Sequence, residues 1–243
     1  SICEAAKEKI RKACQCPTAQ VEFLVGGTQT NATVIDSFLP SYQGILCADS
    51  GHIAVHEAGA IELTRHKVLP LKGKDGKLSP KALEAFLSDF ALDENKAHTV
   101  QPGMVYLSQP TEYGSLYSKA ELTAISELCK KHRLLLFVDG ARLAYALAAP
   151  ENDIKLPDLA RLCDVFYIGG TKCGAMFGEA VVIPDSTRLP HFFTSIKQHG
   201  ALIAKGWLLG LQFDELFKDE LYLHIGEKAN AYAREIKATL KDA

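Results

Sequence analysis

The alternation of short apolar runs with longer amphipathic stretches constrains the fold of this chain more than any other feature. The apolar runs, each long enough for one buried strand, cover residues 21–25, 45–48, 104–107, 134–138, 165–168 and 180–183. Helical patterns lie around and between them, over residues 2–14, 28–39, 79–88, 119–132, 141–148 and 156–163. Strands that alternate with helices are typical of a mostly parallel sheet between helices. We therefore predict an α/β fold with a central sheet.

The sequence changes character after Ile183. A Pro-Asp-Ser turn follows, and residues 191–240 then show an almost unbroken helical pattern without a further strand. Residues 201–216 are apolar over most helical faces, which predicts burial in a core or a subunit interface. We expect a first domain over residues 1–184 and a helical segment over residues 185–243. That segment would lead into a small C-terminal domain that is truncated.

Composition and charge restrict the partners of the chain. The sequence has 27 Lys and Arg against 29 Asp and Glu, 47% hydrophobic residues and 23% charged residues, as in ordinary globular proteins. No local basic stripe is evident, so we expect no nucleic-acid partner. The apolar runs are far shorter than the roughly 20 residues that span a membrane, so we expect no membrane partner.

The seven cysteines favour a reducing compartment. Their number is odd and most of them stand among apolar residues, so we predict buried free thiols and a cytoplasmic protein. Cys14 and Cys16 are separated by one residue, whereas structural zinc pairs are usually two to four apart. We assign no metal site. The chain opens at Ser1 without an initiator Met or a secretory pattern, which indicates a fragment or a processed form.

Three segments follow strands at the edge where parallel sheets carry their sites. The first is Gly26-Gly27-Thr28-Gln29-Thr30-Asn31, which offers backbone N–H groups, hydroxyls and a positive helix end to an anion. It is neither a G-x-G-x-x-G fingerprint nor a P-loop. A common Gly-Gly turn with a Thr cap explains the same residues without a ligand.

The other two segments each carry one ionisable residue. Asp139 ends an apolar strand, where it either caps the next helix or holds a proton on a bound ring nitrogen. Lys172 stands among small residues after another strand. It is either solvated or shielded enough to lose its proton and act as a Schiff-base nucleophile.

The order of the three segments favours one chemistry. A phosphate cradle, then an Asp at a strand end, then a Lys 33 residues later is the order in pyridoxal phosphate enzymes of the aspartate aminotransferase fold. A Rossmann dehydrogenase instead needs a Gly fingerprint near the first strand and an acidic residue about 20 residues on. Cys47-Ala48-Asp49 is only a loose approximation of that acidic position.

At this point the sequence resembles the threonine aldolase and β-eliminating lyase family. The resemblance rests on five blocks in family order, which cover most of the chain: Gly26 to Asn31, Gly51-His52 to Gly59, Gln109-Pro110-Thr111-Glu112-Tyr113-Gly114, Val138-Asp139-Gly140-Ala141-Arg142, and Thr171-Lys172-Cys173-Gly174. It implies the fold of pyridoxal-phosphate-dependent transferases, with residues 1–184 as the cofactor-binding large domain.

The resemblance also implies roles for residues that hold the cofactor. Lys172 would bind pyridoxal 5'-phosphate covalently, and Asp139 would pair with the pyridine nitrogen. His52 would stack on the ring and take part in proton transfer. The cofactor phosphate would be held by Gly27, Thr28 and Gln29. Thr171 would also be among the cofactor-binding residues.

Two further residues would act on the substrate. Arg142 would bind the carboxylate of a small amino acid through a charge-assisted pair. The family usually has Glu-Asn-Thr-His-Asn where this chain has Gln109 to Tyr113, so Glu112 replaces the histidine near the substrate hydroxyl. Glu112 would then be the base. Around Lys172 the usual Ser-Lys-Gly-Leu-Gly becomes Thr-Lys-Cys-Gly-Ala, which keeps a hydroxyl before the lysine.

The implied reaction is retro-aldol cleavage of a β-hydroxy-α-amino acid of the threonine or allo-threonine type to glycine and an aldehyde. β-Elimination or transamination on the same fold stays open, because one cofactor supports all three outcomes. A non-catalytic member also stays open, given the altered 109–113 segment. The family further implies a homodimer or homotetramer with the active site at the interface.

Overall fold

The computed structural model describes residues 1–241 of the chain, with no side-chain description for the last of these. Seven strands form one sheet in the order β1-β7-β6-β5-β4-β2-β3. Their bounds are β1 Gln20–Leu24, β2 Gln43–Ala48, β3 Val68–Leu71, β4 Gln101–Ser108, β5 Leu135–Asp139, β6 Val165–Gly169 and β7 Glu179–Ile183. The sheet is mostly parallel: among the described strand pairs, only those that β7 makes with β1 and with β6 are antiparallel. The predicted α/β architecture is confirmed.

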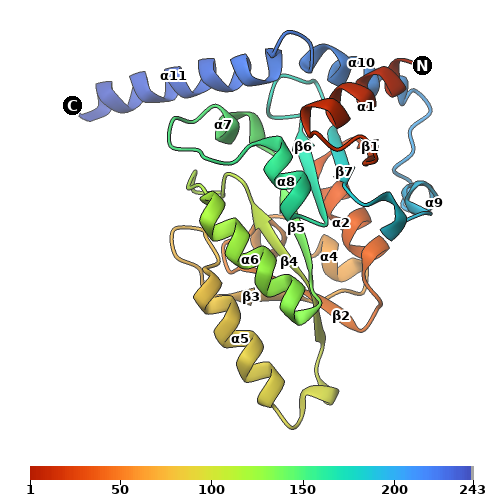
Figure 1. The fold of residues 1–243 in the computed structure, drawn as a ribbon, viewed down its shortest axis with the longest axis vertical. Coiled ribbons are helices and arrows are strands. Elements are labelled where there is room, and N and C mark those ends of the chain that lie inside the picture. The colour runs from red at the N-terminus through yellow and green to blue at the C-terminus, as the bar shows by residue number, and fades with distance from the viewer. Residues whose placement is uncertain (242–243) are drawn as a thin grey trace.

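Helices cover both faces of this sheet (Figure 1). Their bounds are α1 Ile2–Ala13, α2 Gly27–Phe38, α3 His52–Val55, α4 Ala60–Leu63, α5 Pro80–Leu92, α6 Lys119–His132, α7 Leu143–Leu147, α8 Leu156–Leu162, α9 Phe192–Gln198, α10 Trp207–Leu216 and α11 Leu221–Lys241, with short 3-10 turns at Lys96–His98 and Ser186–Arg188. Serine side chains cap the starts of α5 and α6. Ser79 caps α5 through the N–H of Ala82, at 3.1 Å, and Ser118 forms a capping box with Glu121 at the start of α6.

The two helical layers bury separate apolar cores. On one face, side chains of α1, α5, α6, α8 and α10 pack on the sheet, among them Ile10, Leu83 and Phe213. On the other face, α2, α3, α4 and α9 supply a second core that contains Val34 and Phe192. Each fully buried large aliphatic or aromatic side chain stabilises the fold by about 1.5–3 kcal/mol. The sheet is therefore fixed from both sides, and the loops at its carboxyl edge have a rigid base.

The helical segment after Ile183 differs from its prediction in one respect. The pattern predicted almost continuous helix, but the chain forms three helices, and residues 199–206 between α9 and α10 are irregular. Gly200 in this stretch has φ +65°, a left-handed conformation that ends α9. Within α10, Leu209 and Phe213 are buried while Trp207 and Leu211 are about half exposed, so only one face meets the core.

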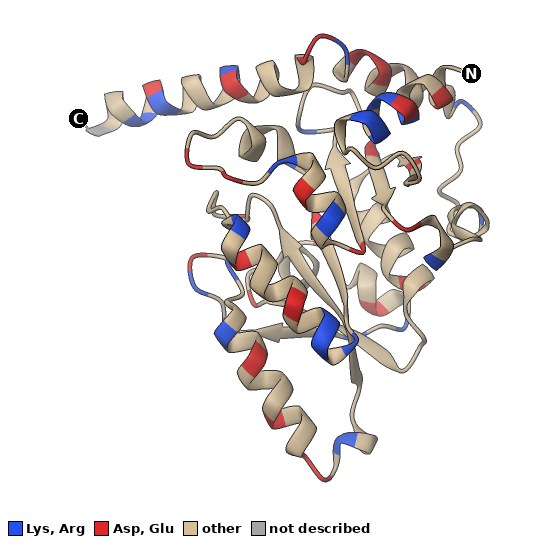
Figure 2. Ribbon diagram, viewed as in Figure 1, with Lys and Arg blue, Asp and Glu red and all other residues tan. Residues whose placement is uncertain are grey.

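The charged residues are spread over the outer helices with both signs mixed (Figure 2). No helix in residues 1–241 is long and apolar enough to cross a membrane. All seven cysteines are free, and five of them are buried. Over the described part of the chain, no cluster of three or more His, Cys, Asp or Glu side chains has an arrangement that could hold a metal ion.

Candidate active site

A cavity of about 230 Å³ lies at the carboxyl edge of the sheet, where five of the strands end. Its walls come from segments far apart in the sequence: Val25, Gly26, Gly27, Thr28, His52, Ser108, Pro110, Glu112, Asp139, Ala141, Arg142, Tyr167, Thr171, Lys172 and Glu179. Eight of the nine residues predicted for the site are among them. The exception is Gln29, which lies outside this wall and whose Oε1 is buried without a hydrogen-bond partner.

The start of α2 forms one end of the cavity. Gly26 is the N-cap, and no side chain caps the helix, so N–H groups of the first turn have no side-chain acceptor. Because the helix end carries a partial positive charge as well, it suits a phosphate. Gly27 also keeps room here, since a Cβ on it would lie 3.1 Å from the Tyr167 hydroxyl oxygen.

Asp139, at the end of β5, lies at the other end of the cavity and is 4% exposed. Its Oδ1 accepts from the N–H of Ala141 at 2.9 Å. Its Oδ2 accepts from Asn31 Nδ2 at 3.2 Å and from the Tyr106 hydroxyl. Burial and then the charge of Asp139 raise the pKa of Tyr106 well above its usual value, so Tyr106 remains a donor. Three donors therefore fix the carboxylate of Asp139 in place.

A second buried carboxylate holds His52. The side chain of Glu57 is fully buried, and its Oε1 lies 2.7 Å from His52 Nδ1. The same oxygen accepts from Asn31 Nδ2 at 2.8 Å, so Asn31 bridges Glu57 and Asp139. The hydrogen bond with Glu57 raises the pKa of His52 above 6.5, although partial burial opposes the shift. With Nδ1 committed to Glu57, the Nε2 atom of His52 is left for the cavity.

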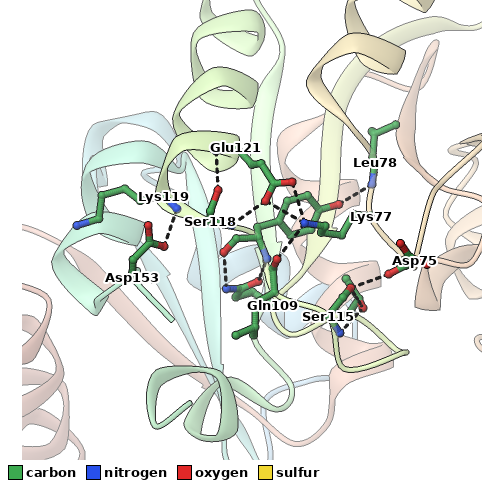
Figure 3. Close-up of polar contacts among 12 residues, drawn as sticks. Asp75, Lys77, Leu78, Gln109, Ser115, Ser118, Lys119, Glu121 and Asp153 are labelled. Carbon is green, nitrogen blue, oxygen red and sulfur yellow. Dashed lines mark hydrogen bonds and ion pairs between the residues drawn. The ribbon is translucent and has the colours of Figure 1, made fainter. Parts of the chain in front are cut away.

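Hydrogen bonds fix both Glu112 and the loop that carries it. Its Oε1 accepts from Ser108 Oγ at 2.8 Å and from the N–H of His52 at 3.0 Å. The loop that carries it is fixed by Gln109, which exchanges two hydrogen bonds with the backbone of Tyr117, and by the contact of the Ser115 hydroxyl with the Asp75 carbonyl (Figure 3). The loop is thus ordered from both ends, and Glu112 faces the cavity in a defined position.

The turn after β6 presents Lys172 at the cavity rim. Lys172 and Thr171 are exposed, so the structure does not give the lysine the shielded surroundings that the sequence left open. The next residue, Cys173, is completely buried, and burial raises the pKa of its thiol. Tyr145 closes the turn by donating its hydroxyl to the Lys172 carbonyl.

Arg142, the N-cap of α7, is a second basic side chain in the cavity wall besides Lys172. Over the described residues, the ion pairs of the structure involve neither Arg142 nor Lys172. Arg142 can therefore bind the carboxylate of a ligand, and Lys172, once it has lost its proton, can react with the carbonyl of a ligand.

Sequence reasoning missed several residues of the site. Tyr167 and Ser108 line the cavity from apolar strands. Asn31 stands in the predicted 26–31 segment, but its role as a bridge between Glu57 and Asp139 was missed. Glu179, the first residue of β7, is 3% exposed and also faces the cavity. The only signal for it was a lone carboxylate before the apolar run 180–183. Its place became evident only from the pairing of β7 with its neighbours.

Comparison with known proteins identifies the family. Residues 3–236 match the family described as β-eliminating lyase. The chain belongs to the β-eliminating lyase family. This match covers nearly all of the chain and includes every residue of the cavity wall.

Named relatives within this family include threonine aldolases. The chain is 32% identical to a low specificity L-threonine aldolase of Pseudomonas aeruginosa over 225 residues, which are 92% of this chain and 64% of that protein. A structure of Leishmania major threonine aldolase is 46% identical to this chain, with a TM-score of 0.95. The superposition covers all of this chain and 70% of the Leishmania chain. The chain thus spans somewhat less than two thirds of the Pseudomonas relative.

More distant structures agree in fold. A pyridoxal-phosphate-bound C–S lyase of Staphylococcus hominis is 14% identical, with a TM-score of 0.72 over 99% of this chain and 58% of its own. An aromatic aminotransferase from Pyrococcus horikoshii, 17% identical, has a TM-score of 0.74 over 99% of this chain and 63% of its own. The predicted aspartate aminotransferase type of fold is confirmed.

The cavity residues of this family member offer the groups that pyridoxal phosphate requires. The uncapped start of α2 offers donors for a phosphate, and Asp139 offers a fixed carboxylate for a ring nitrogen. Close backbone approach also leaves space only for glycine at two of the surrounding turns, because a Cβ on Gly170 would lie 2.6 Å from the Gly178 carbonyl and one on Gly140 would lie 2.1 Å from the Tyr167 carbonyl.

Proposed function

We propose that this protein is a pyridoxal-phosphate-dependent lyase that cleaves a β-hydroxy-α-amino acid of the threonine or allo-threonine type to glycine and an aldehyde. The observation that carries the proposal is the meeting of Lys172, Asp139, His52 and Arg142 in one cavity beside the uncapped start of α2. The threonine aldolase relatives at 32% and 46% identity support the same reaction.

The bound cofactor would supply an electron sink for the carbanion left when the Cα–Cβ bond breaks. Lys172 would hold the cofactor through its amine, and its position at the rim of the cavity supports this role. Asp139 keeps a proton on the ring nitrogen, because a carboxylate fixed by three donors cannot turn away from it. His52 would cover the ring, and its Nε2 atom would be available to the ligand, because Nδ1 is held by Glu57.

Arg142 and Glu112 would act on the substrate. Arg142 binds the α-carboxylate, which also offsets the electrostatic cost of a second carboxylate nearby. Glu112 accepts the β-hydroxyl proton, since it lines the cavity and its Oε1 is already oriented by Ser108 and by the backbone of His52. The replacement of the usual histidine by Glu112 thus keeps a base at this position.

β-Elimination is the second candidate, and the family match supports it. The two reactions differ in the proton that a base removes: the β-hydroxyl proton in retro-aldol cleavage and the Cα proton in elimination. Release of glycine and acetaldehyde from L-threonine would support the aldolase. Release of ammonia and a 2-oxo acid from the same substrate would support elimination.

We also propose that residues 1–184 form the cofactor-binding large domain and that the protein works in the cytoplasm as a homodimer or homotetramer. The exposed Lys172 and Thr171 support an active site that a second copy covers. The half-exposed Trp207 and Leu211 of α10 offer apolar surface for such an interface. Light scattering on the purified protein tests the assembly. The free thiols support a reducing compartment.

The first experiment is an absorbance spectrum of the protein with added pyridoxal phosphate, before and after borohydride, beside Lys172→Ala. A cofactor band that borohydride fixes covalently in the wild type, and that the variant lacks, would support the proposed cofactor and lysine. Absence of such a band in the folded wild type would refute them. A band without turnover of any β-hydroxy amino acid would indicate a non-catalytic family member.

A further inference from the structure

Glu179 occupies an unusual position in the cavity. It pairs with Leu24 of β1 on one side and with Gly169 of β6 on the other. The segments that follow those two residues are the Gly26-Gly27-Thr28 turn and the Gly170-Thr171-Lys172 turn. The register of the sheet therefore places a carboxyl group between the two turns that offer donors to an anion.

The surroundings of Glu179 confirm this placement. Its Oε2 accepts from the N–H of Gly170 at 3.1 Å, and its side chain is 3% exposed. The cavity wall includes Glu179 together with Gly26, Thr28 and Thr171. An ionised carboxylate in this position would repel a phosphate dianion, and the low local dielectric would strengthen the repulsion.

We propose that Glu179 binds the cofactor phosphate in its protonated form and donates its O–H to a phosphate oxygen. The proposal rests on the proposed cofactor. A protonated carboxyl keeps one oxygen as an acceptor for Gly170 and turns the other into a donor, so that both groups are satisfied. The site would then bind a phosphate together with one proton, which Glu179 holds.

Burial and one neighbouring charge make Glu179 easier to protonate than an ordinary glutamate. Burial raises its pKa to about 7, hydrogen bonds from Thr171 and Gly170 oppose this, and the charge of Asp139 on β5 adds to it. Lys172 favours the ionised form. The phenols of Tyr167 on β6 and Tyr222 on α11 and the thiol of Cys173 also lie near, and their pKa values are all raised, so they stay neutral. A phosphate dianion would raise the pKa of Glu179 further.

The test is the pH dependence of cofactor affinity. Dissociation constants for pyridoxal phosphate and for pyridoxal, which lacks the phosphate, are measured by absorbance from pH 7 to 9, and their ratio isolates the phosphate from the chemistry at Lys172. Because binding would require a proton on Glu179, the preference for the phosphorylated ligand should fall as pH rises, approaching tenfold per pH unit. A preference that does not change over this range in the wild type would overturn the proposal.

Glu179→Gln sharpens the test, because glutamine keeps an acceptor for Gly170 and a donor that does not titrate. This variant should keep its preference for the phosphorylated ligand at pH 9, at least about tenfold above the wild type. Glu22→Gln is the matched control, since it changes a carboxylate of β1 that pairs with Lys7 and is not part of the cavity wall, and it should retain the wild-type pH dependence. A Glu179→Gln variant with the wild-type dependence would refute the role.

The outcomes separate this inference from the proposed function. If the wild type binds neither ligand, the proposed cofactor fails. If the wild type binds pyridoxal phosphate and cleaves threonine, but its preference for the phosphorylated ligand does not change with pH, only the role of Glu179 fails. If Glu179→Gln does not fold by circular dichroism, the wild-type ratio alone decides.

Discussion

The two ends of the cavity are built by different means. One end, which we propose holds the cofactor ring, is called the ring end. A mostly buried chain of hydrogen bonds runs there through His52, Glu57, Asn31 and Asp139. The other end, which we propose holds the cofactor phosphate, is called the phosphate end. Its donors are backbone N–H groups at the start of α2 and the hydroxyls of Thr28 and Thr171, and Glu179 lines the same part of the cavity. The ring end is ordered by its own side chains, whereas the phosphate end would gain its last hydrogen bonds from the proposed cofactor. Changes at the ring end should therefore alter stability and proton placement, and changes at the phosphate end should alter affinity.

The largest expected effect is at Lys172, which stands between the two ends. Lys172→Ala should lower the rate of threonine cleavage by at least about a thousandfold, because the covalent route is lost. Stability should change little, since the side chain is exposed. Turnover and urea unfolding measured together check this. Substantial residual turnover would contradict the role of Lys172.

Next in size is Asn31→Ala, which breaks the ring-end network. The change leaves the buried carboxylates of Glu57 and Asp139 without their shared donor, so the free energy of unfolding should fall by about 2–3 kcal/mol. Asn230→Ala is the control, because that amide donates at 2.9 Å to one backbone carbonyl in a half-buried place, and it should cost about 1 kcal/mol or less. Equal losses in urea unfolding would remove the special role of the bridge.

Glu57→Gln should change the protonation of His52. The hydrogen bond with Glu57 raises the pKa of His52 above 6.5, so the variant should lower it, as NMR titration of the ring would report. Since the folded pKa is raised, the stabilisation by this pair is fully present below about pH 6.5 and is lost as pH rises through the folded pKa. Glu84→Gln is a matched control, since this exposed carboxylate pairs with Lys131 and not with a histidine, and it should leave the titration of His52 unchanged. An unchanged His52 titration in Glu57→Gln would show that Glu57 does not set its protonation.

The smallest expected effect is at the phosphate end. Gly27→Ala should weaken cofactor affinity by a few-fold, because its Cβ would come within 3.1 Å of the Tyr167 hydroxyl and shift the first turn of α2. Tyr167→Phe in the same chain should restore part of the affinity by removing that contact. Spectral titration with pyridoxal phosphate measures both. No recovery in the double variant would indicate that the methyl group disturbs the donors themselves.

Local patterns in the sequence were enough to predict much of the fold. Six of the seven strands lie where apolar runs predict them, because strands buried on both faces need continuous apolar side chains. Strand β3 escaped prediction since it has only four residues, lies at the sheet edge and contains Pro70. The break between α9 and α10 also escaped, because it depends on the backbone of Gly200 within an otherwise helical pattern.

The site was predictable where it follows family motifs and not where it depends on packing across the sheet. Lys172, Asp139 and His52 stand in recognisable blocks, and the structure brings them to one cavity. Glu179 and Asn31 act through partners 9 and 108 residues away, respectively, so no local spacing reveals them. Strand register, which sets those partnerships, is a property of the assembled sheet.

The burial of Cys173 bears on the chemical selectivity of the site. Thiols add readily to aldehydes, and this one is the immediate neighbour of the amine that we propose binds an aldehyde cofactor. Its complete burial and raised pKa keep it as an inert thiol, because the thiolate is the reactive form. The aldehyde would therefore meet an accessible amine and no accessible sulfur in this turn. A thiol-directed alkylating agent should likewise leave this turn unmodified while the protein stays folded.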